Sequence, residues 1–197
     1  MGTPKEPKPV KLFIALLSRH KELFSSVDRD LSALFGSIDS TSGPLPWTVT
    51  DYYKEEMGPG LLRRFVSFTP LISPEKLPEI KLTTQELEGN YQWVEAGKRG
   101  RRVNIDPGYL DVGKVVLAST KSASHRIYLG YGICGEITLL FHDGSFHPFV
   151  YTYPDYLWPE TLSFFTSLRS LYLKQLKDIG QPAGTRQQAT DGRQRID

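Results

Sequence analysis

The pattern of apolar and polar positions predicts alternating strands and helices in the first half of the chain. The apolar run at residues 11–17 has the length of a strand, and residues 20–35 place apolar side chains on one face of a helix that ends at Gly36. The expected elements are a strand at 11–17, a helix at 20–35, strands at 47–53 and 61–69, a helix from 73 to about 93 and a strand at 101–105, with a loop at 37–46 and a turn at 54–60.

This order of strand, helix, strand, strand, helix and strand is that of a ferredoxin-like βαββαβ unit, in which two split βαβ halves share one antiparallel sheet. The second half of the chain predicts a turn at 106–108, strands at 126–131, 133–141 and 146–151, a hairpin turn at 142–145 and a helix from 159 to about 179. Residues 111–120 fit either a helix or a strand. We therefore expect an α+β fold, with a ferredoxin-like N-terminal half, a C-terminal β-hairpin region and a closing helix.

The composition is that of an ordinary globular protein, with 39% hydrophobic and 23% charged residues among 197. We expect a flexible arm at 1–9, a single domain at 10–179 and a disordered tail at 180–197. Cys134 is the only cysteine, which excludes an intrachain disulfide and is typical of a reducing compartment. No apolar run approaches the roughly 20 residues of a membrane span, and no signal peptide pattern is present. The sequence therefore predicts a cytoplasmic protein without membrane contacts.

Positive charge is concentrated between residues 98 and 136. This segment holds seven basic and three acidic residues, so its net charge of +4 exceeds the +2 of the whole chain, which favours an anionic ligand. Lysine and arginine can hold phosphate groups, histidine can transfer protons, and a carboxylate can orient the histidine. We assign candidate catalytic roles to His125, Asp106 and Glu136, and candidate ligand-binding roles to Asn104, Tyr109, Lys114, Lys121 and Arg126.

The other histidines have no metal-ligand spacing, so no metal site is expected. Residues 108–114 (GYLDVGK) match the first seven positions of a phosphate loop, but Val115 replaces the hydroxyl residue that binds magnesium. We expect this segment to be a turn followed by an exposed lysine.

Five ordered motifs resemble a known family. TDYYKEEMG, RRFVSF, RRVNIDPGYL, HRIYLG and TYPDY occur with the order and spacing of the family catalogued as domain of unknown function 4416, over residues 11–176. The resemblance implies a bacterial cytoplasmic protein and supplies no activity, although some members are labelled GTP-binding.

The leading hypothesis is that the chain binds a phosphate-bearing small ligand such as a nucleotide, with or without turnover; the sequence names no cofactor and no oligomeric state. The alternative is a non-catalytic RNA- or protein-binding module. In that case Phe13 and Phe65, which resemble the aromatic signatures of an RNA-recognition motif, would be exposed and would stack on bases. The competing interpretation is that this face of the sheet is covered by the C-terminal strands and the closing helix.

Overall fold

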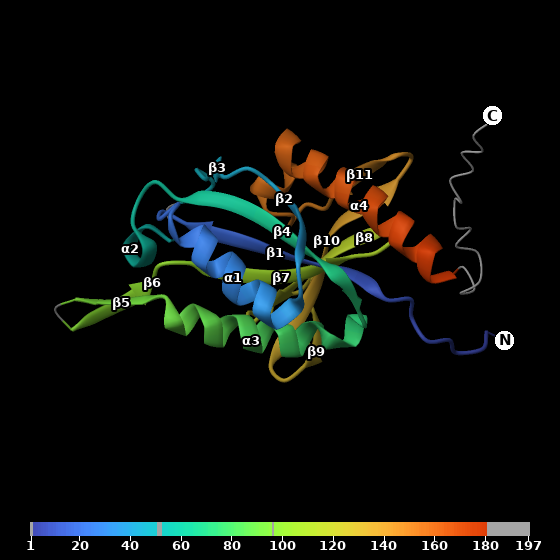
Figure 1. Cartoon of the computed structure of the whole chain (residues 1–197), viewed down its shortest axis with the longest axis horizontal. Coiled ribbons are helices and arrows are strands. Elements are labelled where there is room, and N and C mark those ends of the chain that lie inside the picture. The colour runs from blue at the N-terminus through green and yellow to red at the C-terminus, as the bar shows by residue number, and fades with distance from the viewer. Residues whose placement is uncertain (1, 51–52, 96, 181–197) are drawn as a thin grey trace, which may run out of the picture.

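A computed structural model describes residues 2–50, 53–95 and 97–180. The described chain is an α+β structure with a mostly antiparallel sheet and the helices α1 (Leu23–Phe35), α2 (Lys54–Met57), α3 (Leu77–Asn90) and α4 (Pro159–Gly180) (Figure 1). Two 3₁₀ turns, η1 (Pro74–Lys76) and η2 (Pro154–Leu157), precede α3 and α4. No helix in these residues is long and apolar enough to cross a membrane.

In the part of the chain that the structure describes, the sheet contains nine strands, and its main path follows the order β11-β10-β8-β7-β1-β4-β2, with β3 beside β4 and β9 beside β10. The strands are β1 (Val10–Ser18), β2 (Ile38–Thr41), β3 (Leu45–Pro46), β4 (Leu62–Ile72), β7 (Asn104–Leu110), β8 (Lys114–Ser119), β9 (Ile127–Gly130), β10 (Ile133–His142) and β11 (Ser145–Pro148). A separate hairpin of β5 (Gln92–Glu95) and β6 (Lys98–Arg101) projects from one end of the molecule (Figure 1).

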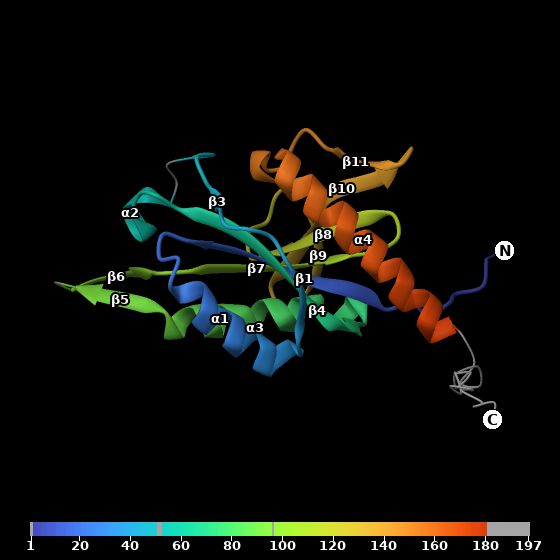
Figure 2. The same ribbon diagram turned by 45° about the horizontal axis from the view of Figure 1, so that its top comes forward.

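Helices α1 and α3 cover one face of the sheet, whereas α4 lies across the other (Figure 2). Side chains alternate between the two faces of a strand, so β1 serves both layers. Leu12, Ile14 and Leu16 join the cluster under α1 and α3, and Phe13 and Ala15 join the cluster under α4. Because both faces are covered, β1 reads as an unbroken apolar run rather than as an alternating one.

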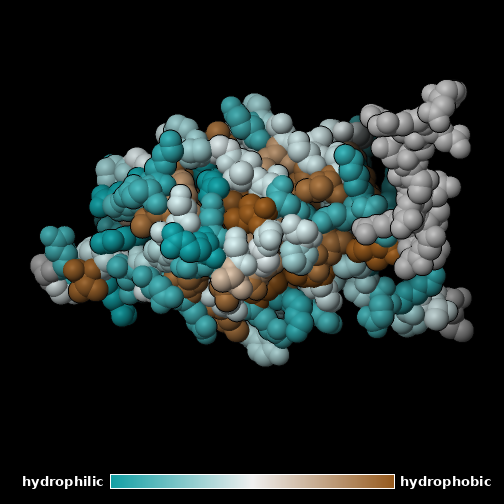
Figure 3. Space-filling model, in the orientation of Figure 1, coloured by the Kyte–Doolittle hydropathy of each residue, from teal (hydrophilic) through white to brown (hydrophobic). Residues whose placement is uncertain are grey.

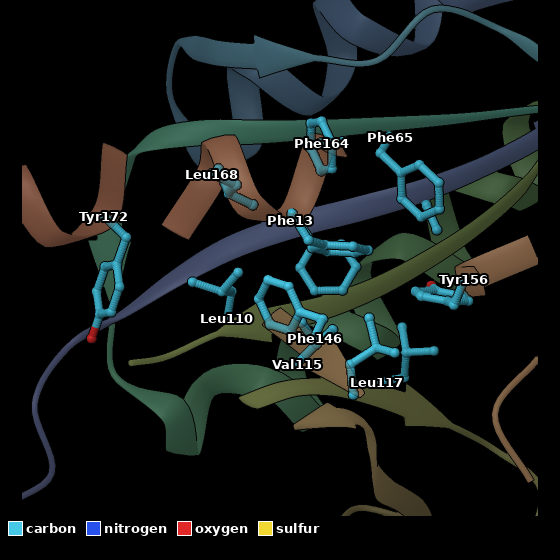
Figure 4. Close-up of a cluster of buried hydrophobic side chains, with 13 residues drawn as sticks. Phe13, Phe65, Leu110, Val115, Leu117, Phe146, Tyr156, Phe164, Leu168 and Tyr172 are labelled. Carbon is cyan, nitrogen blue, oxygen red and sulfur yellow. The ribbon is translucent and has the colours of Figure 1, made fainter. Parts of the chain in front are cut away.

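The layer under α4 is a cluster of buried aromatic and aliphatic side chains (Figure 4). Phe13 and Phe65 are fully buried, and the ring of Phe13 meets that of Phe165 edge to face at 4.9 Å between centroids. Gly108 of β7 makes this packing possible, since a Cβ there would lie 2.5 Å from the Phe13 ring. The packing interpretation of this face is confirmed, and neither ring can stack on a base.

The face of the molecule that is seen in the orientation of Figure 1 carries both hydrophilic and hydrophobic residues, and hydrophobic ones are grouped in its central part (Figure 3). The predicted helices at 20–35 and 159–179, the strands at 11–17 and 133–141 and the hairpin turn at 142–145 are confirmed within one to three residues at each end. Strand β8 decides the open choice at 111–120 in favour of a strand.

The strand predicted at 47–53 is wrong. The second strand is β2, inside the expected loop, and positions 51 and 52 lie outside the described residues. Trp47 follows β3 instead, and its ring is buried in a small cluster with Leu17, Met57 and Leu61. The β-branched and aromatic residues that suggested a strand include Trp47, whose ring closes one end of the core.

The turn predicted at 106–108 and the strand predicted at 101–105 are also wrong. Residues 104–110 form β7, which pairs along its length with β1, and Arg101 belongs to the separate strand β6. Asp, Pro and Gly usually mark turns, but here the register of Ile14 with Pro107 and Phe13 with Gly108 holds them in the sheet.

The expected terminal segments are only partly described. Residues 2–9 contain no helix or strand, and the expected tail lies outside the described residues apart from Gly180. The division into arm, single domain and tail stays a prediction.

Candidate functional site

A cavity of about 440 Å³ opens where β7 and β8 stop pairing. The two strands pair only where Gly108–Leu110 of β7 face Val115–Leu117 of β8. The beginning of β7 pairs with β1 alone, and the end of β8 pairs with β10 alone. The cavity is lined by the unpaired ends of both strands and by side chains from α3, β4 and η2. Its size is within the range of small-molecule sites, roughly 300–1,000 Å³.

Charged side chains are numerous in this cavity: among the described residues, five basic and four acidic ones line it. They are Arg63, Lys81, Arg101, Lys121, Arg126, Glu88, Asp106, Glu136 and Asp155. Most of these side chains form hydrogen bonds or ion pairs with one another, so only the atoms outside these pairs are available to a ligand.

Arg63 of β4 forms a buried ion pair with Asp155 of η2. Its Nε donates to Asp155 Oδ2 at 2.7 Å, and only 6% of the residue is exposed. Burial has the largest single influence and opposes the charge of the guanidinium, but Asp155 together with Tyr156, Asp106 and Tyr53 more than offsets it, so the pKa of Arg63 lies above its ordinary value. Its Nη1 is buried and has no hydrogen-bond partner within the described residues.

Asp106 of β7 is held by Lys81 of α3. Lys81 Nζ donates to Asp106 Oδ1 at 2.9 Å and to the carbonyl of Ile105 at 3.3 Å, and the Asn104 side-chain amide donates to Asp106 Oδ2. Burial raises the pKa of Asp106, but Lys81 and the other donors more than offset this, so the pKa lies below its ordinary value. Asp106 is therefore an ionised, fully engaged carboxylate at neutral pH.

Glu88 of α3 is engaged in the same way. Its Oε1 accepts the backbone N–H of Ile105 at 2.6 Å, and its Oε2 accepts Arg101 Nη1 at 3.1 Å. Arg101 also donates to both oxygens of Glu56, at 2.7 and 2.9 Å, and to Asn104 Oδ1 at 2.6 Å. Burial raises the pKa of Glu88 despite these donors.

Only one of the two carboxylate oxygens of Glu136, a residue of β10, has hydrogen-bond partners in the described residues. Arg126 Nε donates to Oε2 at 2.6 Å, and His125 Nε2 lies 3.1 Å from the same atom. Arg126 is fixed in turn by Ser119 Oγ and the carbonyl of Lys121, each at 2.9 Å. Glu136 Oε1 is buried and has no partner in the described part of the chain.

The structure brings five of the eight predicted site residues to the cavity wall: Asn104, Asp106, Lys121, Arg126 and Glu136. His125 is not among the residues that line the cavity; it contacts Glu136 and stacks on Tyr151, with 4.1 Å between ring centroids. His125 lies in a loop, and the strand predicted from residue 126 begins at Ile127. The roles assigned to these residues stay predictions.

Lys114 and Tyr109 do not reach the cavity. Lys114 bonds to Asp111, and Tyr109 packs beside a cluster of apolar residues under α3. Asp111 Oδ1 also accepts the backbone N–H groups of Gly113 and Lys114, each at 2.8 Å, so the segment is a tight turn between two strands. A phosphate loop leads into a helix, whereas this segment leads into β8.

Sequence reasoning missed Arg63, Trp47, Lys81 and Asp155. Arg63 occupies an inward position of a strand, and a charged residue at such a position is the signal that could have indicated a buried site. Trp47 Nε1 is a second buried donor on the cavity wall without a partner in the residues described.

Within the described residues, three buried atoms on cavity-lining residues have no hydrogen-bond partner: the donors Arg63 Nη1 and Trp47 Nε1 and the acceptor Glu136 Oε1. An unsatisfied buried polar group costs about 1–3 kcal/mol, so a bound molecule that supplies the missing partners gains that energy. No group of three or more His, Cys, Asp or Glu residues in the described ranges is arranged to hold a metal ion.

The chain belongs to the family described as Domain of unknown function (DUF4416), whose model matches residues 8–172. This match contains every cavity residue named above. No curated protein and no solved structure matches the chain.

Proposed function

We propose that the cavity binds a small phosphate-bearing ligand, such as a nucleotide, with or without turnover. The observation that carries the proposal is the pair of buried, unused donors, Arg63 Nη1 and Trp47 Nε1, on the wall of a cavity of ligand size. A phosphate group offers several acceptor oxygens and a negative charge, and arginine is well suited to it.

The carboxylates of the cavity do not prevent this binding. Asp155 is neutralised by Arg63, Asp106 by Lys81, and Glu88 by Arg101. Lys121 adds a further positive side chain at the cavity wall. The internal pairs therefore use up most of the carboxylate acceptors, whereas Arg63 Nη1 and Trp47 Nε1 have no partner in the described residues.

Binding has more support than turnover. Asp106 is ionised and held by Lys81 and Asn104, which makes it a poor proton donor. His125 does not line the cavity, and it contacts Glu136, which does. If the site turns its ligand over, Glu136 is the group placed to accept a proton.

We further infer that the strands β7-β1-β4-β2, together with α1 and α3, constitute a ferredoxin-like unit. Support comes from the interior position of β1 between β7 and β4 and from both helices packing on one face. On this interpretation, the strands from β8 onward extend the unit to nine strands, and the cavity lies at the junction.

A thermal-shift panel of nucleotides, sugar phosphates, inorganic phosphate and short RNA tests the proposed function, because a ligand that binds only the folded state raises the melting temperature. We expect stabilisation by at least one phosphate ester. Stabilisation by RNA alone would favour the alternative of a non-catalytic RNA-binding module, and no stabilisation by any phosphate ester would refute the proposal.

A further inference from the structure

The unused oxygen of Glu136 places a second requirement on the ligand. Glu136 is 3% exposed, and Arg126 and His125 already occupy its Oε2. In the ionised carboxylate the remaining atom, Oε1, can only accept a hydrogen bond, and an ionised phosphate oxygen cannot supply one because it is also an acceptor and carries the same charge.

We infer that the ligand carries a hydroxyl or amino group in addition to its phosphate, and that this group donates a hydrogen bond to Glu136 Oε1. The inference rests on the proposed function. The phosphate takes the donors of Arg63 and Trp47, and the hydroxyl or amino group takes the acceptor of Glu136. Because donors and an acceptor lie at two different places, they would fix the orientation of the ligand. Inorganic phosphate alone could satisfy the donors but not the Glu136 oxygen.

The test compares two probes of matched size, glycerol 3-phosphate and n-propyl phosphate, which differ only in two hydroxyl groups. A buried carboxylate oxygen left unpaired by the second probe should weaken its binding about tenfold or more. Isothermal titration calorimetry with the full chain measures both affinities.

The variant Glu136→Gln sharpens the test, because its carbonyl oxygen can replace Oε2 while its NH₂ group, a donor, replaces Oε1. A hydroxyl group could still accept a hydrogen bond from this NH₂, so the variant is tested with 3-aminopropyl phosphate, whose ammonium group can only donate. We expect the unmodified protein to prefer 3-aminopropyl phosphate over n-propyl phosphate, and we expect this preference to disappear in Glu136→Gln. The matched control is Glu88→Gln, since Glu88 lines the same cavity but both of its oxygens are already bonded. This control should keep the preference, and circular dichroism should show folding of both variants.

The possible results separate the inference from the proposed function. Equal binding of both probes to the unmodified protein overturns the inference and leaves the proposed function standing, even if Glu136→Gln fails to fold. A preference for 3-aminopropyl phosphate over n-propyl phosphate that persists in a folded Glu136→Gln variant also overturns it. If neither probe binds, the inference fails, and the proposed function fails with it only if the thermal-shift panel shows no stabilisation.

Discussion

Two buried charged networks in this protein differ in whether they are complete. Lys11 of β1 is fully buried, and its ammonium donates to Asp39, to the carbonyl of Phe68 at 2.7 Å and to Gln175 Oε1 at 2.9 Å. These partners use all three of its hydrogens. The cavity network instead leaves Arg63 Nη1 and Glu136 Oε1 without partners in the described residues.

The complete network around Lys11 has a structural role, whereas the incomplete network of the cavity is suited to binding. Burial lowers the pKa of Lys11 although Asp39 opposes the shift, and the lysine joins β1 to the residues after α1 and to α4. The complete network therefore has no capacity for a ligand, whereas the incomplete one has both a free volume and unsatisfied atoms. The predictions below test this contrast.

The largest effect is expected on stability when Lys11 is replaced. Lys11→Met leaves Asp39 without its cation and should lower the free energy of unfolding by about 3 kcal/mol. Chemical denaturation measures this loss. Ligand affinity of the folded fraction should be unchanged, and reduced affinity would mean that the two networks are coupled.

Arg63→Lys should mainly affect binding. A lysine can keep the ion pair with Asp155 but lacks the second arm of the guanidinium, so affinity for a phosphate ester should fall by about 1.5–3 kcal/mol. The control is Arg64→Lys, because Arg64 bonds to Asp28 at 2.7 and 2.9 Å and does not line the cavity. Equal losses in both variants would show that the phosphate site is elsewhere.

Trp47→Phe removes an unused donor and keeps an aromatic ring. Affinity for a phosphate ester should fall by about 0.5–1.5 kcal/mol, the net value of one hydrogen bond. The melting temperature of the ligand-free protein should change little, because no bond in the described structure is lost at Nε1. A strong loss of stability with intact affinity would assign the indole N–H a structural role.

The smallest effect is expected at Lys121. Lys121→Gln removes a positive charge from the cavity wall and should weaken phosphate binding by about 0.2–1 kcal/mol, typical of an exposed charge. Lys114→Gln removes the same charge outside the cavity and should leave the affinity unchanged. Titrations at two salt concentrations should show a reduced salt dependence only for Lys121→Gln.

The sequence by itself determined the elements whose signals are local. The apolar run of β1, the one-sided pattern of α1 and the Asp143-Gly144 turn depend on residues close together in the chain, and each was predicted. The pattern could not place Trp47 or Asp106 correctly, because the core contacts of Trp47 and the pairing of Asp106 with β1 are long-range.

The same distinction holds for the candidate site. His125, Arg126 and Glu136 lie within a dozen residues, and the sequence placed them with Asp106 in one candidate site. In the structure both His125 and Arg126 contact the Glu136 carboxylate. Lys114 was grouped with them wrongly, since the turn at Asp111 holds it away from the cavity.

Only the tertiary structure decided which atoms face the cavity. Arg63 meets Asp155 across 92 positions of the chain, and α3 brings Lys81 to Asp106 across 25. No local pattern encodes such meetings, because they depend on the strand order and on where β7 and β8 separate. Whether a buried polar atom is satisfied depends on all of its neighbours in space, and therefore only the folded chain shows that Arg63 and Glu136 each retain an unused atom.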